Sequence, residues 1–230
     1  MTRGVFVTGT DTGVGKTVAC AALIHALRHA GAKPVPMKPI AAGASEIEGA
    51  PVNEDTLALM QAAGLPRTTA HDVTPILLRE PMAPHVAARR EHRRIHLEPV
   101  RASFARLRAA GDFVVVEGVG GFVVPLDDGL DTVDLARLFE LPVVLVVGMR
   151  LGCLNHALLT AGAIEASGLP FAGWIANHVD PAMAVPDENV AALESRLRAP
   201  MLGRLPFSAQ PDAADLARHL DVTTLLARRA

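Results

Sequence analysis

The chain has 230 residues, half of them hydrophobic and a fifth charged, with a net charge of −2. This composition excludes a disordered chain, and the near-neutral balance gives no overall basic field for nucleic acid or an anionic membrane. Two cysteines exclude a disulfide scaffold and a four-cysteine zinc site, and an aromatic content of 3% without tyrosine disfavours base-stacking surfaces.

Patterns of buried strands alternate with helical patterns along the chain. We predict strands over residues 5–7, 35–38, 113–116, 142–147, 171–177 and 201–205, and helices over residues 16–29, 53–63, 131–140, 154–167 and 187–198. Fully apolar strands in such alternation predict one α/β domain over 1–230, with a mostly parallel sheet covered by helices on both faces. Ligands then bind beyond the carboxyl ends of the strands.

No signal-peptide pattern precedes the first glycines, and no apolar run reaches the roughly 18 residues of a membrane-spanning helix. We therefore expect a cytoplasmic protein.

The strongest local motif is GTDTGVGKT, from Gly9 to Thr17, between a predicted strand and a predicted helix. Such glycines allow backbone N–H groups to surround a phosphate, Lys16 reaches the terminal phosphates, and the Thr17 hydroxyl holds Mg²⁺. The usual spacing requires a glycine at position 10, where this chain has Thr10. An ordinary glycine turn is the alternative, but Gly-Lys-Thr in this context favours a nucleotide site.

Carboxylates, a lysine and a second glycine loop fall at the same predicted edge. Glu117 ends a buried strand and Asp55 opens a helix, so both are candidate Mg²⁺ ligands, although Asp55 also suits a helix first turn. Lys38 is the last residue of the second predicted strand, where an ammonium group can neutralise a transferring phosphoryl group. Taken by itself, Lys38 could equally be a lysine exposed to solvent. Gly118 to Gly121 follow Glu117 as a loop or tight turn.

Several motifs together resemble the dethiobiotin synthetase family of P-loop NTPases. They are FVTGTDTGVGKT (6–17), MKPIAAG (37–43), NEDTLAL (53–59), EPMAPH (80–85), VVEGVGG (115–121), LPVVLVVGMRLGCLNHALLTA (141–161), GWIANHV (173–179) and LGRLPF (202–207). They occur in the family's order over nearly the whole chain, and the early glycine of the phosphate loop is similar to the family's own variant.

The resemblance implies a ligase of biotin biosynthesis that uses MgATP to join CO2 to 7,8-diaminononanoate. One amine forms a carbamate, ATP phosphorylates it to a carbamic–phosphoric anhydride, and the second amine closes the ureido ring, releasing ADP and phosphate. The resemblance also implies a homodimer with each site at the interface.

Site residues carried over from the family fall into four groups. The resemblance implies Lys38 as the catalytic residue and Thr17, Asp55 and Glu117 as Mg²⁺ ligands. It implies a substrate-carboxylate site at Gly152, Cys153, Leu154 and Asn155. It implies ATP contacts by Gly13, Val14, Gly15, Lys16, Thr17, Val18, Asp55, Glu117, Gly118, Val119, Gly120, Asn177, His178, Pro206, Phe207 and Ser208.

The chain also departs from the family pattern. Ala42 stands where a substrate-contacting serine is frequent, and His178 replaces a frequent acidic residue, which leaves base selectivity open. Arg150 replaces a common lysine, and Phe207 replaces a frequent tryptophan. His156 is a packed helix residue that positions Asn155 or, as the alternative, a general base, and we expect the first.

Two other classes share the phosphate loop. A partitioning ATPase typically carries a further lysine early in the loop, where this chain has Thr10, Asp11 and Thr12. An amide ligase acting on corrin acids carries an added glutaminase domain, for which 230 residues leave no room.

Overall fold

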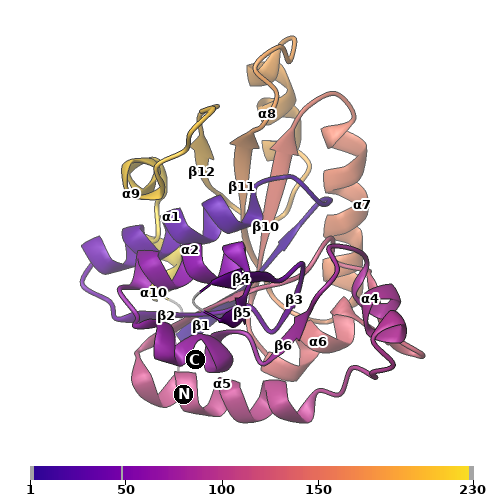
Figure 1. The fold of residues 1–230 in the computed structure, drawn as a ribbon. Coiled ribbons are helices and arrows are strands. Elements are labelled where there is room, and N and C mark those ends of the chain that lie inside the picture. Colours follow the sequence, from indigo (N-terminus) through magenta and orange to yellow (C-terminus); the bar gives the residue numbers. More distant parts are fainter. Residues whose placement is uncertain (1–2, 48, 228–230) are drawn as a thin grey trace.

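The computed structural model describes residues 3–47 and 49–227, and its centre is a six-stranded parallel sheet in the order β12-β11-β10-β1-β7-β2 (Figure 1). These strands are β1 (Arg3–Gly9), β2 (Pro34–Met37), β7 (Phe113–Glu117), β10 (Val143–Met149), β11 (Phe171–His178) and β12 (Met201–Leu205). All six were predicted, each within two residues of the observed bounds, so the predicted fold class is confirmed.

Three small two-stranded sheets lie outside the central one: β3 (Ile40–Ala42) with β6 (Ile76–Leu78), β4 (Ser45–Ile47) with β5 (Ala50–Val52), and β8 (Pro125–Asp127) with β9 (Leu130–Asp131). The helices are α1 (Lys16–His29), α2 (Glu54–Ala63), α3 (Ala70–Val73), α4 (Pro84–Arg90), α5 (Glu98–Ala110), α6 (Thr132–Phe139), α7 (Cys153–Ala166), α8 (Pro186–Glu194), α9 (Ala213–Leu216) and α10 (Thr223–Ala227), with 3-10 turns at Arg67–Thr69 and Ala217–His219. Among the described residues, none of the helices combines the length and apolarity needed to cross a membrane.

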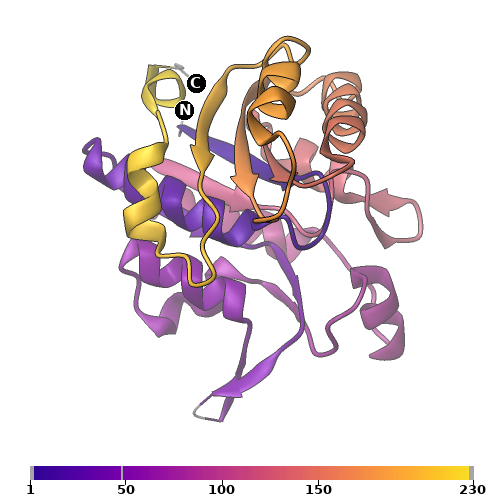
Figure 2. The same ribbon diagram turned by 90° about the horizontal axis from the view of Figure 1, so that it is seen from above.

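The central strands are buried on both faces, as their apolar sequences predict. In β10, Val144 and Val146 belong to the core beneath α1, whereas Val143, Leu145 and Val147 belong to the core on the opposite face. The first core also receives side chains from α9 and α10, and the second receives side chains from α5, α6, α7 and α8. Figure 2 shows these two helical layers from above. Burial of both faces leaves only the strand ends for binding chemistry.

The strand order reverses at β1, which lies between β7 and β10. The chain runs from β1 to the edge strand β2, returns to β7, and then continues on the other side of β1 with β10. A crevice forms at such a reversal, beyond the carboxyl ends of the strands. The loop after β1 therefore lies at the position where α/β sheets of this kind bind ligands.

The structure differs from the sequence prediction at α8 and α5, and the short helices α3, α4, α9 and α10 were not predicted. The helix predicted over residues 187–198 is α8, which starts at Pro186 and ends at Glu194. It ends early because the chain after Ser195 turns to place Leu197 in the core and to bring Pro200 beside β11, where the Trp174 N–H donates to the Pro200 carbonyl. Helix α5 was not predicted, although its buried side chains Val100, Phe104 and Leu107 have helical spacing.

Candidate active site

The loop between β1 and α1 is built around glycines that a side chain would disrupt. Gly13 and Gly15 have φ angles of 73° and 76°, which favour glycine. A Cβ on Gly15 would collide with the Asn177 side-chain nitrogen, and one on Gly9 would lie 2.7 Å from Val14. The loop folds back on the end of β1, which explains the early glycine at position 9. It delivers the N-terminus of the 14-residue helix α1 to the crevice, where unpaired N–H groups favour an anion.

Lys16 lies over this loop. Its Nζ donates to the Asp11 carbonyl at 3.0 Å, and the residue is 8% exposed. Burial lowers the pKa of Lys16, although the Glu117 carboxylate opposes the shift. An anion bound to the loop would compensate the buried ammonium charge.

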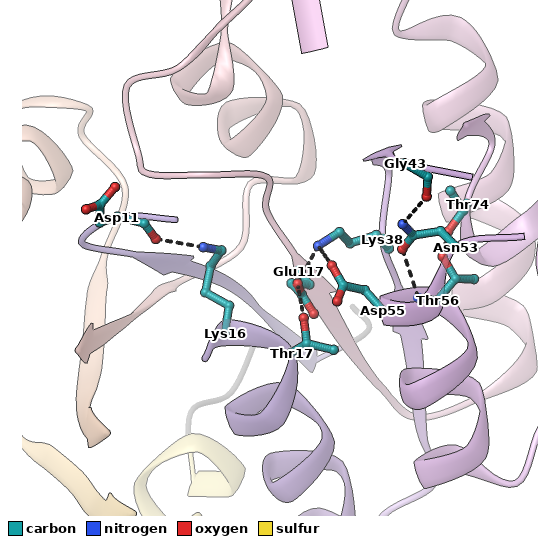
Figure 3. A network of polar contacts seen from close by, with 10 residues as sticks. All are labelled: Asp11, Lys16, Thr17, Lys38, Gly43, Asn53, Asp55, Thr56, Thr74 and Glu117. Carbon is teal, nitrogen blue, oxygen red and sulfur yellow. Dashed lines mark hydrogen bonds and ion pairs between the residues drawn. The ribbon is translucent and has the colours of Figure 1, made fainter. Parts of the chain in front are cut away.

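Four side chains come together from α1, α2, the end of β7 and the residue after β2: Thr17, Asp55, Glu117 and Lys38 (Figure 3). Met37 pairs with Val116 in the parallel register of β2 and β7, so Lys38 and Glu117 emerge side by side at the carboxyl ends of these strands. The Lys38 Nζ donates to Asp55 Oδ2 at 2.9 Å and to Glu117 Oε1. The Thr17 hydroxyl donates to that same Glu117 oxygen at 2.9 Å. The structure thus joins the predicted catalytic lysine, the three predicted metal ligands and the start of α1 in one network.

The network keeps Lys38 charged. Burial alone would lower the pKa of Lys38, but the carboxylates of Glu117 and Asp55 outweigh it and raise this pKa above its ordinary value. Burial would raise the pKa of Asp55, but Lys38 lowers it below its ordinary value. Lys38 is therefore an ammonium group throughout the neutral range, suited to neutralising negative charge rather than to accepting a proton.

Asp55→Asn is expected to lower the free energy of unfolding by about 1 kcal/mol at pH 7, because the Asp55 side chain is 44% exposed and water screens its ion pair with Lys38. The folded-state pKa of Asp55 lies below its ordinary value of 3.8, so its stabilising effect is present above that value and lost as the pH falls through the folded-state pKa. Urea unfolding of both proteins at pH 7 and pH 3 tests this. A wild-type advantage that is equally large at pH 3 would contradict it.

One oxygen of the network has no protein partner. Glu117 Oε2 is buried and accepts no hydrogen bond within the described part of the chain. With Asp55 and the Thr17 hydroxyl it presents hard oxygen donors, which suit Mg²⁺. No group of three or more histidine, cysteine, aspartate or glutamate side chains gathers among the described residues to form a metal cage. The oxygen donors of Thr17, Asp55 and Glu117 fit a Mg²⁺ ion that takes its remaining ligands from water and a bound phosphate.

The glycine loop after Glu117 lies against the phosphate loop. The Gly118 N–H donates to the Val7 carbonyl at 2.9 Å, and a Cβ on Gly118 would lie 3.0 Å from the Phe6 ring. Gly120 has a φ of 64°, and a Cβ there would lie 3.8 Å from the Thr12 hydroxyl. The two predicted backbone loops therefore border the same space.

The residues predicted to contact the base lie at the ends of β11 and β12. Asn177 is 7% exposed, and its side-chain nitrogen donates to the Val14 carbonyl at 2.8 Å, which ties β11 to the phosphate loop. Pro206, Phe207 and Ser208 follow β12 and are exposed. Burial, reinforced by Arg204, lowers the pKa of His178, so this side chain tends to be neutral at pH 7. Base recognition by these residues stays a prediction.

The segment predicted to meet a carboxylate forms the start of α7. Gly152 caps this helix with a φ of 94°, whereas Leu151 before it is 96% exposed. The Cys153 side chain is buried, and its N–H donates to the Arg150 carbonyl, so neither group of Cys153 is available to a ligand. His156 is exposed, so the prediction that it packs within its helix is wrong for this chain.

One link across the site was not predicted. An Arg150 nitrogen donates to Asp11 Oδ2 at 2.7 Å, the other Asp11 oxygen accepts from the Thr12 N–H, and the Asp11 carbonyl accepts from Lys16. Asp11 therefore connects the phosphate loop with the segment that precedes α7. The sequence offered no signal for this contact, because the two residues are 139 positions apart.

Arg150→Met is expected to weaken binding of a non-hydrolysable ATP analogue about fivefold, because it removes a half-exposed ion pair worth at most about 1 kcal/mol. Arg150→Lys is expected to retain most of the affinity, and Asp11→Asn combined with Arg150→Met should cost no more than Arg150→Met alone. Calorimetric titration of these variants tests the link. Unchanged affinity in Arg150→Met would show that the contact does not order the loop.

The chain is similar to known proteins over nearly its whole length, and the two relatives described below have the same name. A family described as "AAA domain" matches residues 3–225. The chain is 52% identical over 222 residues to "ATP-dependent dethiobiotin synthetase BioD" of Aromatoleum aromaticum, covering 95% of this chain and 96% of the relative. It is 54% identical over 227 residues to the protein of the same name in Ralstonia nicotianae, covering 97% of both.

Solved structures show the shared architecture. A ParA family ATPase from Chlorobium tepidum superposes with a TM-score of 0.54 at 16% identity, covering 95% of this chain and 90% of that one. The signal recognition particle receptor FtsY of Elizabethkingia anophelis, in complex with GDP, has a TM-score of 0.54 at 14% identity and covers 100% of this chain and 64% of that one. At these identities the likeness shows the fold alone.

Proposed function

The chain belongs to the family of ATP-dependent dethiobiotin synthetases, and from this premise we propose how its site closes the ureido ring of dethiobiotin, a ligase reaction of biotin biosynthesis. The observation that carries the proposal is the network of Lys38, Asp55, Glu117 and Thr17 at the start of α1. It places a charged ammonium group and two carboxylates beside a loop built for phosphate.

The reaction proceeds in three steps. One amine of 7,8-diaminononanoate adds to CO2 and loses a proton, giving a carbamate. A carbamate oxygen attacks the γ-phosphorus of ATP, and the bond to the ADP oxygen breaks. The second amine then attacks the carbamate carbon, the bond from carbon to the phosphate oxygen breaks, and the ring closes as phosphate leaves and the amine releases a proton.

The residues contribute mainly charge and position. Backbone N–H groups from Gly13 to Val18 and the Lys16 ammonium bind the triphosphate. Lys38 stabilises the negative charge of the carbamate and of the transferring phosphoryl group, since its ammonium group lies at the carboxyl edge of the sheet and stays protonated. Thr17, Asp55 and Glu117 would hold Mg²⁺, which supplies further positive charge to the phosphates when bound. Because a carbamate readily loses CO2, holding it close to the γ-phosphate is the largest part of catalysis.

The start of α7 binds the substrate carboxylate. Gly152, Leu154 and Asn155 offer helix N-terminal N–H groups, and Cys153 fixes the turn through its buried side chain. Leu151, Leu159 and Val123 are exposed by 96%, 67% and 62%, and exposed apolar groups of this size support burial against a partner. The proposal is a homodimer in which this helix start reaches the partner's site.

Several further features belong to the proposal. Asn177 and His178, with Pro206 to Ser208, border the nucleotide base, and the Gly118–Gly120 loop faces both nucleotide and substrate. Ala42 ends β3 without a polar group to contact the substrate. The enzyme works in the cytoplasm as a single domain.

The test is product formation. Purified protein given diaminononanoate, bicarbonate and MgATP is expected to form dethiobiotin and ADP in equal amounts, measured by mass spectrometry, and to form ADP slowly without the diamine. Lys16→Ala serves as the inactive control. If ATP is hydrolysed at the same rate with and without the diamine and no ureido product forms, the proposal is rejected in favour of an ATPase switch.

A further inference from the structure

Lys38 occupies the position between two carboxylates that a divalent ion would share. Its Nζ lies 2.9 Å from Asp55 Oδ2 and also donates to Glu117 Oε1 (Figure 3). Thr17 donates to that same Glu117 oxygen at 2.9 Å. Oxygens from all three proposed metal ligands therefore already take part in one network centred on an ammonium group.

The Lys38 backbone is held by a hydrogen bond, whereas its long side chain has rotatable bonds. The Lys38 N–H donates to the Val73 carbonyl at 2.8 Å, and β3 begins two residues later at Ile40. The ammonium group ends a flexible four-carbon stem with rotatable donors. A short movement of the side chain therefore exchanges its carboxylate partners for a nearby anion without refolding the loop.

The charges around this point favour such an exchange only when nucleotide is present. Lys16 and Lys38 bring two positive charges and Asp55 and Glu117 two negative charges, so these four groups balance one another. A bare divalent cation would add two positive charges beside two ammonium groups, which is unfavourable at short range. A triphosphate brings more negative charge than the divalent ion neutralises, and this excess attracts both lysines.

We propose that the Lys38 ammonium group occupies the metal site of the nucleotide-free enzyme. It leaves the carboxylates of Asp55 and Glu117 only when a divalent ion binds together with ATP. The inference rests on the proposed function and adds an order of events to it. The ammonium group that steadies the carbamate turns toward the substrate when the nucleotide and its metal are in place. The empty enzyme accordingly binds a bare divalent ion weakly.

Glu117 Oε2 offers an alternative way to bind the divalent ion, in which Lys38 does not move. This oxygen is buried and has no hydrogen-bond partner among the described residues. A divalent ion that bound through Oε2 alone would leave Lys38 on Asp55 and Glu117 Oε1. The two arrangements differ in whether the Lys38 side chain moves and in whether its removal strengthens metal binding.

The first test measures Mn²⁺ binding without nucleotide by electron paramagnetic resonance. Lys38→Met is expected to bind Mn²⁺ at least tenfold more tightly than the wild type, because both carboxylates lose their ammonium partner. Lys33→Met is the matched control, since it removes the same charge from an exposed side chain and should bind as the wild type does. Affinities within threefold of each other in the wild type and Lys38→Met would overturn the proposal.

The second test uses the wild-type protein and so does not depend on a variant that folds. The chain contains only three lysines, Lys16, Lys33 and Lys38, so lysine labelled with ¹³C at the ε carbon gives three NMR signals. Mg²⁺ with a non-hydrolysable ATP analogue is expected to shift the Lys38 signal, whereas Mg²⁺ alone leaves it in place, and the Lys33 signal should not move. A Lys38 signal that shifts equally with nucleotide lacking any divalent ion, or that stays fixed with both present, would overturn the proposal.

Failure of this inference and failure of the proposed function give different results. If the enzyme forms dethiobiotin but its Lys38 NMR signal does not shift when the metal–nucleotide complex binds, the proposed reaction is supported and the movement of Lys38 is wrong. If no dethiobiotin forms but Lys38→Met binds Mn²⁺ more tightly than the wild type and Lys33→Met do, the movement of Lys38 is supported and the proposed reaction is wrong.

Discussion

Lys38→Met is expected to reduce kcat roughly 100- to 1000-fold, the cost of losing one preorganised group that stabilises transition-state charge. The reason is that Lys38 is 4% exposed and its ammonium group is held by two carboxylates at the carboxyl edge of the sheet. Affinity for a non-hydrolysable ATP analogue is expected to change less than threefold, because the phosphate loop and Lys16 remain. Steady-state kinetics and calorimetric titration measure the two quantities separately.

Lys33→Met is the matched control for this prediction. It removes the same charge from an exposed position and is expected to leave both kcat and ATP affinity unchanged. Because Lys38→Met leaves Asp55 and Glu117 without their ammonium partner, its folding is checked by urea unfolding before kinetics. A folded Lys38→Met protein with near wild-type kcat would show that the reaction does not use this ammonium group.

Lys16→Ala is expected to weaken ATP binding roughly 10- to 100-fold, the cost of one or two charge-assisted hydrogen bonds to phosphate, and to lower kcat as well. Its Nζ lies over the phosphate loop on the Asp11 carbonyl, and the bound triphosphate is expected to replace that carbonyl as its partner. Titration with the ATP analogue, followed by single-turnover kinetics at saturating ATP, measures both effects.

The contrast between the two lysines tests the division of roles. Lys16 is expected to affect both ATP binding and turnover, and Lys38 mainly turnover. Equal losses of ATP affinity in Lys16→Ala and Lys38→Met would contradict this division, since both side chains would then act as simple phosphate ligands.

The sequence predicted the central sheet and the phosphate loop because both have strong local signals. The fully apolar strand at residues 142–147 indicated burial on two faces, and β10 is buried along its whole length. The juxtaposition of Lys38 and Glu117 also followed from the sequence, because parallel strands bring their carboxyl ends to one edge. The alternative of a solvated Lys38 is excluded by its burial.

Other features depend on long-range packing that local patterns do not encode. The three-residue strands β3 and β6 pair across more than thirty intervening residues, and neither is long enough to show a period. The Asp11–Arg150 contact joins segments far apart in the chain. Helix α5, in contrast, has a local signal from which it could have been predicted: Pro99 in its first turn, followed by Val100, Phe104 and Leu107 at helical spacing.

The path of oxygen from CO2 into phosphate decides the central claim about this site. The claim is that the lysines and backbone N–H groups of this site hold a carbamate against the γ-phosphate of ATP, so that a carbamate oxygen forms the new bond to phosphorus. When the reaction starts from ¹⁸O-labelled CO2, the released phosphate is expected to carry one labelled oxygen in the same proportion as the ureido carbonyl of dethiobiotin. Labelled dethiobiotin accompanied by unlabelled phosphate would contradict the claim.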